Sequence, residues 1–136
     1  MSAEPDLDAL FAAAKAVQQK AYAPYSRFKV GAAILGEDGK VYPGCNVENA
    51  AYPVGACAEA GAISAMIAGG ARTIRAIVVI GDGAELVTPC GACRQRIREF
   101  SVPETPILIA GPEGIRARFS LAELLPASFG PANLPK

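Results

Sequence analysis

Three cysteines and one glutamate have the residue types and spacing that metal-dependent hydrolysis requires. Cys90 and Cys93 form a C-x-x-C pair directly after Pro89. If this pair opens a helix, residues three apart share one face, so both sulfurs can point at a single atom. Unpaired N–H groups and the dipole at a helix N-terminus also stabilise thiolates. The pair alone predicts either a metal site or a thioredoxin-like redox dithiol.

A second motif, Cys57-Ala58-Glu59, favours the metal site. We expect Cys57 at the start of another helix and Glu59 near the third position, from which a glutamate can bend back past the N-terminus. Two helices that start at one ion would supply three thiolates and leave a fourth zinc position for water, which is the catalytic pattern. We expect the remaining cysteine, Cys45, to pack in the core. As a fourth ligand it would instead make a structural zinc module.

The chain contains no histidine, and this absence narrows the chemistry. Hydrolysis by Ser-His-Asp or Cys-His groups is excluded, and so is every metal site that needs imidazole. A metal site built by this chain must therefore use cysteine or carboxylate ligands.

The composition is that of one globular domain. Of the 136 residues, 51% are apolar and 19% are charged, so residues 1–136 are expected to form a single domain with its own core. Thirteen basic residues balance thirteen acidic ones, which argues against nucleic acid or an anionic membrane as a partner. For the local cluster of Arg94, Arg96 and Arg98 we expect a solvated surface.

The location predicted from the sequence is cytoplasmic. The apolar runs are too short to cross a bilayer, and the acidic start MSAEPDLD lacks an export pattern. Four cysteines without an export pattern indicate a reducing compartment, where cysteines serve metals or catalysis more often than disulfides.

Periodicity predicts a mixed α/β chain. Helical spacing covers residues 5–22, 57–69 and 89–100, and Ser120 with Glu123 has the spacing of a capping box for a last short helix. Alternating or continuously apolar stretches predict strands near 28–34, 40–47, 74–80, 105–110 and 115–119. This order implies one mixed sheet with helices packed on it.

The chain resembles the small zinc-dependent cytidine deaminases along nearly its whole length. The matching stretches are residues 21–26, 28–33, 44–50, 57–59, 89–95, 124–126 and 128–130. The resemblance implies a three-layer α/β sandwich, with a mixed five-stranded sheet and helices on both faces. It also implies that Cys57, Cys90 and Cys93 hold zinc and that Glu59 moves protons.

The resemblance further assigns substrate contacts. Phe28 would pack on the pyrimidine, the backbone around Ala58 would read the base edge, and Asn46 and Glu48 would bind ribose hydroxyls. Positions i and i+2 of a strand point to the same side, so the spacing independently places this amide and carboxylate side by side.

Self-association is also implied. Relatives of this size are homotetramers whose sites are completed across subunits, and Tyr52 and Phe129 occupy the positions that would reach into a neighbour's pocket. The apolar, proline-rich tail fits packing on a partner subunit, with folding back on its own domain as the alternative.

The expected reaction is hydrolytic deamination of free cytidine and 2'-deoxycytidine to uridine and 2'-deoxyuridine, a step of pyrimidine salvage. Zinc lowers the pKa of a water molecule, and Glu59 takes its proton. The resulting hydroxide attacks carbon 4 of the ring, while Glu59 protonates ring nitrogen 3 and then the departing amine. The alternatives are deamination of another aminated heterocycle such as a nucleoside antibiotic, a structural zinc module and a redox dithiol.

One position departs from the family pattern. Better-known relatives have an arginine after Cys-Ala-Glu, whereas this chain has Ala60. Three thiolates on Zn²⁺ leave a net negative site. We hypothesise that Arg94, next to Cys93, balances this charge together with the two helix dipoles; the alternative is an ordinary surface charge.

Overall fold

The computed structural model describes residues 6–135, which are arranged around one sheet in the order β2-β1-β3-β4-β5. Strands β3 and β4 are parallel, and the other neighbouring pairs are antiparallel. The mixed five-stranded sheet predicted for this chain is therefore confirmed. The strands are β1 (Gly31–Gly36), β2 (Val41–Cys45), β3 (Ile74–Ile80), β4 (Pro106–Gly111) and β5 (Gly114–Ser120).

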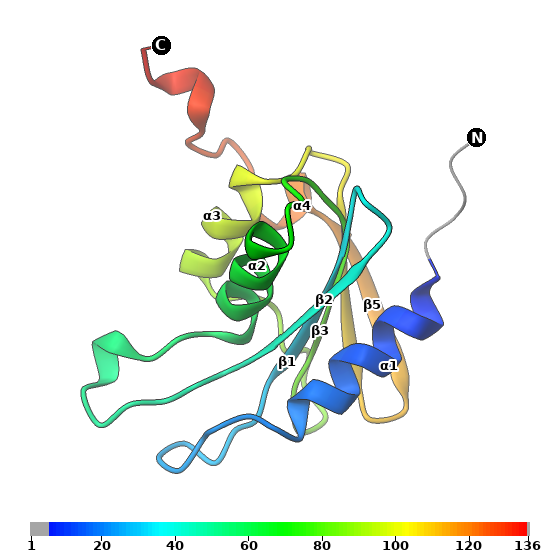
Figure 1. Cartoon of the computed structure of the whole chain (residues 1–136), viewed down its shortest axis with the longest axis vertical. Helices are drawn as coiled ribbons and strands as arrows, with labels where there is room; N and C mark the ends of the chain where they lie inside the picture. Colours follow the sequence, from blue (N-terminus) through cyan, green and yellow to red (C-terminus); the bar gives the residue numbers. More distant parts are fainter. Residues whose placement is uncertain (1–5, 136) are drawn as a thin grey trace.

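Helices cover both faces of the sheet and complete the three layers (Figure 1). One core cluster joins α1 to one face through Leu10 and Ala14, and a second cluster joins α2 and α3 to the other face through Met66 and Ile97. No helix within residues 6–135 is long and apolar enough to cross a bilayer. The helices are α1 (Leu7–Gln18), α2 (Ala58–Ala68), α3 (Gly91–Glu99) and α4 (Leu121–Leu124), with the single turns η1 (Tyr52–Val54) and η2 (Pro131–Asn133).

The first helix is shorter than the predicted 5–22. It begins after Asp6, whose carboxylate accepts a hydrogen bond from Ala9 N at 3.0 Å, and position 5 lies outside the described residues. It ends at Gln18 because the chain beyond it bonds elsewhere. Tyr22 N donates to Asn46 O at 3.0 Å, and Tyr22 O accepts from Glu48 N at 2.8 Å. These contacts with a distant segment replace the helical bonds that periodicity predicts.

The strand predicted from residue 28 begins only at Gly31. The preceding segment is held by a side chain instead of a strand ladder: Asn46 donates to Phe28 O at 2.9 Å and accepts from Val30 N at 2.9 Å. At the other end of the chain, the predicted capping box of Ser120 and Glu123 is present at the start of α4.

Helix α2 lies unusually close to β2, and this contact fixes where the helix starts. A side chain at Gly44 would overlap Ala62 N and would lie 2.6 Å from Ala58 O. Because glycine leaves this space free, the first turn of α2 rests directly on the end of β2. The N-terminus of α2, with Cys57 and Glu59, is therefore held against the sheet.

Candidate active site

Three sulfurs meet where α2 and α3 begin. Cys57 and Cys90 are the N-cap residues of α2 and α3, and Cys93 lies in the first turn of α3. Their Sγ atoms all lie within 4.8 Å of one another. Zinc–sulfur bonds of about 2.3 Å can join such a set to one ion, so the donors fit zinc. Cys45, at the end of β2, does not belong to this cluster.

The surroundings of the three thiols differ. The backbone N–H groups of Cys93 and Ala92 lower the pKa of the exposed Cys90, as expected at a helix start. Burial raises the pKa values of Cys57 and Cys93. Arg96 opposes this effect at Cys93, because its Nη1 donates to Sγ at 3.3 Å. Since a metal binds the thiolate form, the helix start and Arg96 both favour metal binding.

Glu59 is the buried acid beside the sulfurs. Its side chain is only 4% exposed, and burial raises the pKa of its carboxyl. Its own backbone N–H and the Cys93 thiol favour the ionised form and partly oppose that increase. A glutamate with a raised pKa is suited to accept a proton and return it during one reaction.

Two cavities adjoin this group. The smaller, of about 200 Å³, is lined by Val30, Asn46, Cys57, Ala58, Glu59, Val87, Thr88 and Cys90. The larger, of about 470 Å³, is lined by Tyr25, Ser26, Asn46, Val47, Glu48, Asn49, Tyr52, Gly55, Ala56 and Cys57. Asn46 and Cys57 line both, so the two cavities adjoin across these residues.

Asn46 and Glu48 line the larger cavity, and their side chains also bind neighbouring segments of backbone. The Asn46 amide holds the Phe28–Val30 backbone. The Glu48 carboxylate accepts bonds from the backbone N–H groups of Tyr25 at 2.9 Å and Ser26 at 3.0 Å, and from the Ser26 hydroxyl. These bonds, led by the hydroxyl, hold the pKa of Glu48 below its ordinary value.

Of the three aromatic residues predicted to contact substrate, one lines a cavity and two do not. Tyr52 lines the larger cavity and meets Tyr25 edge-on, with ring centroids 6.1 Å apart. Phe28 and Phe129 line neither of the two cavities, and both are exposed. Phe129 belongs to the C-terminal segment, which extends outward beyond α3 and α4 (Figure 1), and its carbonyl accepts a bond from Gln95.

Ala58 lies at the bottom of the smaller cavity, buried as the first residue of α2. Val87 and Thr88, which line the same cavity, were missed by sequence reasoning. They belong to a connection between β3 and α3, where neither a motif nor periodicity indicates which side chains face the site.

Arg94 makes no hydrogen bond to a ligand sulfur among the described residues, and its charge-balancing role stays a prediction. Its guanidinium donates to Pro89 O at 2.7 Å, Leu124 O at 2.9 Å and Thr88 Oγ1 at 3.2 Å, so it supports the backbone around the site. Arg96 makes the contact with sulfur. On a helix, the residue three positions after Cys93 shares its face, whereas the next residue is turned away. The prediction that these arginines form a solvated surface is wrong, because Arg94 makes the bonds above and Arg98 donates to Ser128 Oγ.

A three-thiolate cluster with a buried glutamate, at two helix starts on a mixed sheet, defines the class of zinc-dependent hydrolytic deaminases. The family model described as the cytidine and deoxycytidylate deaminase zinc-binding region matches residues 5–109. The chain belongs to the cytidine deaminase family.

Individual relatives agree over nearly the full chain. The cytidine deaminase of Sporosarcina psychrophila is 42% identical over 95% of both chains, and that of Mycobacterium tuberculosis is 44% identical over 97% of both. The crystal structure of cytidine deaminase from Burkholderia pseudomallei matches with a TM-score of 0.83 at 46% identity, covering 90% of this chain and 98% of that one. The chain therefore combines the fold, the zinc ligands and the family of a zinc-dependent cytidine deaminase, a hydrolase.

Proposed function

We propose that the chain hydrolyses free cytidine and 2'-deoxycytidine to uridine and 2'-deoxyuridine and releases ammonia, as a step of pyrimidine salvage. The observation that carries this proposal is that Cys57, Glu59 and Cys90 line a small cavity that adjoins a larger, partly polar one. The small cavity suits a pyrimidine ring, and the larger cavity suits the sugar.

Glu59 is the proton carrier in this reaction. Cys57, Cys90 and Cys93 would hold the zinc ion, which would supply the Lewis acidity that makes a water molecule nucleophilic at neutral pH. Glu59 takes one proton from that water and gives it to ring nitrogen 3 as the oxygen adds to carbon 4. It then takes the second proton from the added hydroxyl group and gives it to the amine, so that the carbon–nitrogen bond breaks and ammonia leaves. Its burial beside the sulfurs supports this role.

The substrate is held from three sides. The backbone around Ala58 reads the edge of the base, and Phe28 packs on the ring when the nucleoside is bound. Asn46 and Glu48 accept bonds from ribose hydroxyls through lone pairs that remain after their contacts with the backbone. Their position along the larger cavity supports this assignment.

The active form is a homotetramer in this proposal, with Tyr52 and Phe129 completing the site of a neighbouring subunit. Tyr52 is 76% exposed and Phe129 is 57% exposed, which is unusual for large aromatic side chains without a partner. Light scattering of the purified protein tests the assembly, and a monomer that remains fully active would contradict it.

A single domain in the reducing cytoplasm is consistent with this function, because three ligand cysteines must remain unpaired thiolates. All four cysteines are free in the structure.

The decisive experiment is a substrate panel of cytidine, 2'-deoxycytidine, cytosine, CMP and adenosine, assayed by ammonia release with wild type and Glu59→Ala. We expect rapid turnover of the two cytosine nucleosides by wild type and loss of that turnover in Glu59→Ala, with zinc retained. If zinc-loaded wild type releases ammonia from none of the panel, the proposed function is wrong. If Glu59→Ala keeps most of the activity, the substrate assignment stands and the proton carrier is wrong.

A further inference from the structure

The connection between β3 and α3, residues 81–90, carries one wall of the smaller cavity. Val87, Thr88 and Cys90 all belong to it and line that cavity. Residues 82–86 are exposed, so burial does not fix this part of the backbone. An exposed segment of this kind opens easily unless polar contacts hold it.

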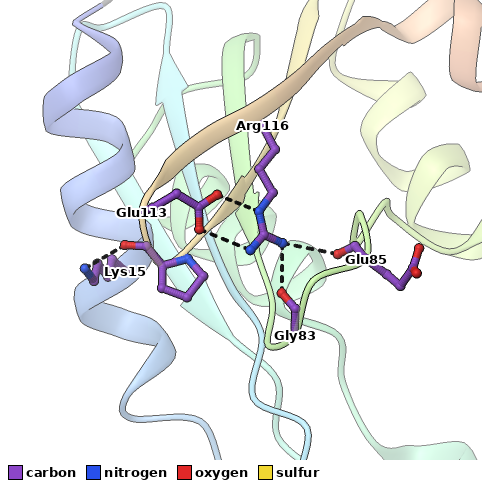
Figure 2. Close-up of polar contacts among 6 residues, drawn as sticks. Lys15, Gly83, Glu85, Glu113 and Arg116 are labelled. Atoms are coloured by element: carbon purple, nitrogen blue, oxygen red, sulfur yellow. Dashed lines mark hydrogen bonds and ion pairs between the residues drawn. The ribbon is translucent and has the colours of Figure 1, made fainter.

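Arg116 supplies such contacts from a strand far away in the sequence (Figure 2). Its Nη1 donates to the carbonyl oxygens of Gly83 at 2.8 Å and Glu85 at 3.4 Å. Its Nε and Nη2 donate to the two oxygens of Glu113 at 2.7 and 3.1 Å. This bidentate ion pair orients the guanidinium, so that its remaining N–H groups face the connection.

The chain leaves room for this arrangement at Gly111, the last residue of β4. Arg116 lies on β5, the strand beyond β4, and its guanidinium passes over Gly111 to reach the connection after β3. A Cβ atom at position 111 would overlap the guanidinium. Any larger residue at this position would therefore displace Arg116.

The turn that carries Glu113 is fixed as well. Lys15 of α1 donates to Pro112 O at 2.9 Å and ties the β4–β5 turn to the first helix (Figure 2). Arg116 therefore links the exposed connection to a supported part of the fold.

A second contact holds the connection from the side of the base-binding segment. Asp82 accepts bonds from Gln18 Nε2 at 3.1 Å and from Lys29 N at 3.2 Å, and Gln18 also donates to Lys29 O at 3.0 Å. Lys29 lies between Phe28 and Val30. Asp82 thus ties the connection to the segment of Lys29 and Val30, which carries another wall of the smaller cavity, and Arg116 holds the backbone of residues 83–85.

We propose that Arg116 is a positioning residue for the deamination, because it holds residues 83–85 and thereby keeps Val87 and Thr88 in place as a wall of the base cavity. Without this contact the connection samples open conformations, and the nucleoside must order it on binding. Binding weakens more than the chemical step, because Glu59 lies on α2, outside the connection, and because Cys90, at the far end of the connection, is held as the N-cap of α3 by the bond from Arg94 N to its carbonyl oxygen.

The experiment compares Arg116→Gln, Arg116→Lys and Gly111→Ala with the matched control Arg118→Gln. Arg118 lies on the same strand and is exposed, and its side chain makes no hydrogen bond or ion pair with residues 6–135. We measure KM and kcat for cytidine, zinc per chain, and amide hydrogen exchange resolved by peptide. These measurements separate loss of substrate binding from loss of zinc or of the whole fold.

We expect the three test variants to raise KM about tenfold, with kcat within about threefold of wild type and zinc unchanged. Exchange should accelerate in residues 82–88 and stay unchanged in α2 and β3. Arg116→Lys should fail to rescue, because one ammonium cannot donate to Glu113 and to both carbonyl groups in this geometry. Arg118→Gln should resemble wild type in every readout.

The proposal is overturned if KM and exchange in residues 82–88 both stay at wild-type values, or if exchange accelerates across the whole chain. It is also overturned if Arg116→Lys behaves as wild type, since charge alone would then suffice. The kinetic part rests on the proposed deamination, whereas hydrogen exchange does not require turnover. If wild type has no activity, the proposed function is wrong, but the exchange data still test whether Arg116 holds the connection. If Arg116→Gln fails to fold, Gly111→Ala provides the same test.

Discussion

The smaller cavity is lined by residues at the N-termini of α2 and α3, whereas the larger cavity is lined by residues 25–26 and 46–57, which are mostly irregular. The second of these segments extends away from the sheet (Figure 1). Ala58, Glu59 and Cys93 are buried on the first side. On the second side, Tyr25 and Tyr52 are exposed, and side-chain-to-backbone hydrogen bonds hold the walls. Core packing therefore positions Glu59 and Cys93, whereas polar bonds position the proposed sugar contacts of the larger cavity.

The carboxylates of the two cavities show the same contrast. Burial raises the pKa of Glu59, whereas hydrogen bonds from Ser26 and Tyr25 hold the pKa of Glu48 low. Environments that move two pKa values in opposite directions assign different tasks. Glu59 can exchange a proton, and Glu48 stays ionised as an acceptor.

The largest effect should follow the loss of a sulfur in the smaller cavity. Cys90→Ala removes one of three ligands, so we expect loss of bound zinc and loss of detectable deaminase activity. Metal analysis of the purified variant and an ammonia-release assay provide the measurement. Cys45→Ala is the matched control and should keep about one zinc per chain. Zinc loss in that control would mean that Cys45 is a fourth ligand and that the site is structural.

A smaller effect is expected on the sugar side. Glu48→Gln replaces an acceptor-only carboxylate with an amide that cannot accept all three bonds from Tyr25 and Ser26. We expect KM for cytidine to rise by about tenfold or more while kcat changes little. Glu104→Gln, at an exposed site outside both cavities, serves as the control.

The pH dependence of KM sharpens this prediction. Because its pKa is lowered in the folded protein, Glu48 stays ionised above its ordinary value of 4.5 and gains a proton only at lower pH. Its contribution to wild-type KM should therefore be constant between about pH 5 and pH 8. A contribution that declines already near neutral pH would show that Glu48 is not held as a carboxylate by these bonds.

Local sequence rules predict the sulfur side well and the sugar side poorly. Spacing and helix-start chemistry place Cys90 beside Cys93 and Cys57 beside Glu59, because these rules act within one turn, and the three sulfurs do meet in the structure. The end of α1 and the start of β1 depend instead on hydrogen bonds with Asn46 and Glu48, which are far from both places in the sequence. No local pattern encodes such pairings.

The contact of Arg96 with sulfur was predictable from the sequence, whereas the contacts of Arg116 were not. The three-residue spacing that joins Cys90 to Cys93 also joins Cys93 to Arg96, so the same rule identifies the arginine that contacts the sulfur. Arg116 reaches residues 83–85 across β4, and its role depends on strand order and on the free space above Gly111.

Arg96 provides a prediction of intermediate size on the sulfur side. We propose that it takes the charge-balancing role, since Ala60 cannot. Arg96→Gln removes a positive charge at Cys93, so the acidic limb of the kcat/KM pH profile should move to higher pH by about half a unit, a modest shift because Arg96 is exposed. Arg94→Gln should leave that limb in place and lower the melting temperature. The reverse pattern would restore the original assignment to Arg94.

The smallest expected effect is the change in protein stability caused by burying the Glu59 carboxyl group. In the metal-free protein, Glu59 has a pKa above its unfolded value, so the folded state binds more protons and stability falls as the pH rises from the unfolded toward the folded pKa. Glu59→Gln removes this dependence. Its melting temperature should match wild type well below pH 4.5, where Glu59 is protonated in both states, and exceed wild type once Glu59 is ionised in both states.

The matching variant on the sugar side should show the opposite sign. Glu48 has a lowered pKa, so its contribution to stability is present above the unfolded pKa and is lost as the pH falls through the folded one. Metal-free Glu48→Gln should therefore be less stable than wild type at neutral pH, where Glu59→Gln is more stable. Two variants that shift stability in the same direction would contradict the division between a buried proton carrier and a hydrogen-bonded acceptor. Opposite shifts would show that the ionised Glu59 destabilises the folded state, whereas the ionised Glu48 stabilises it.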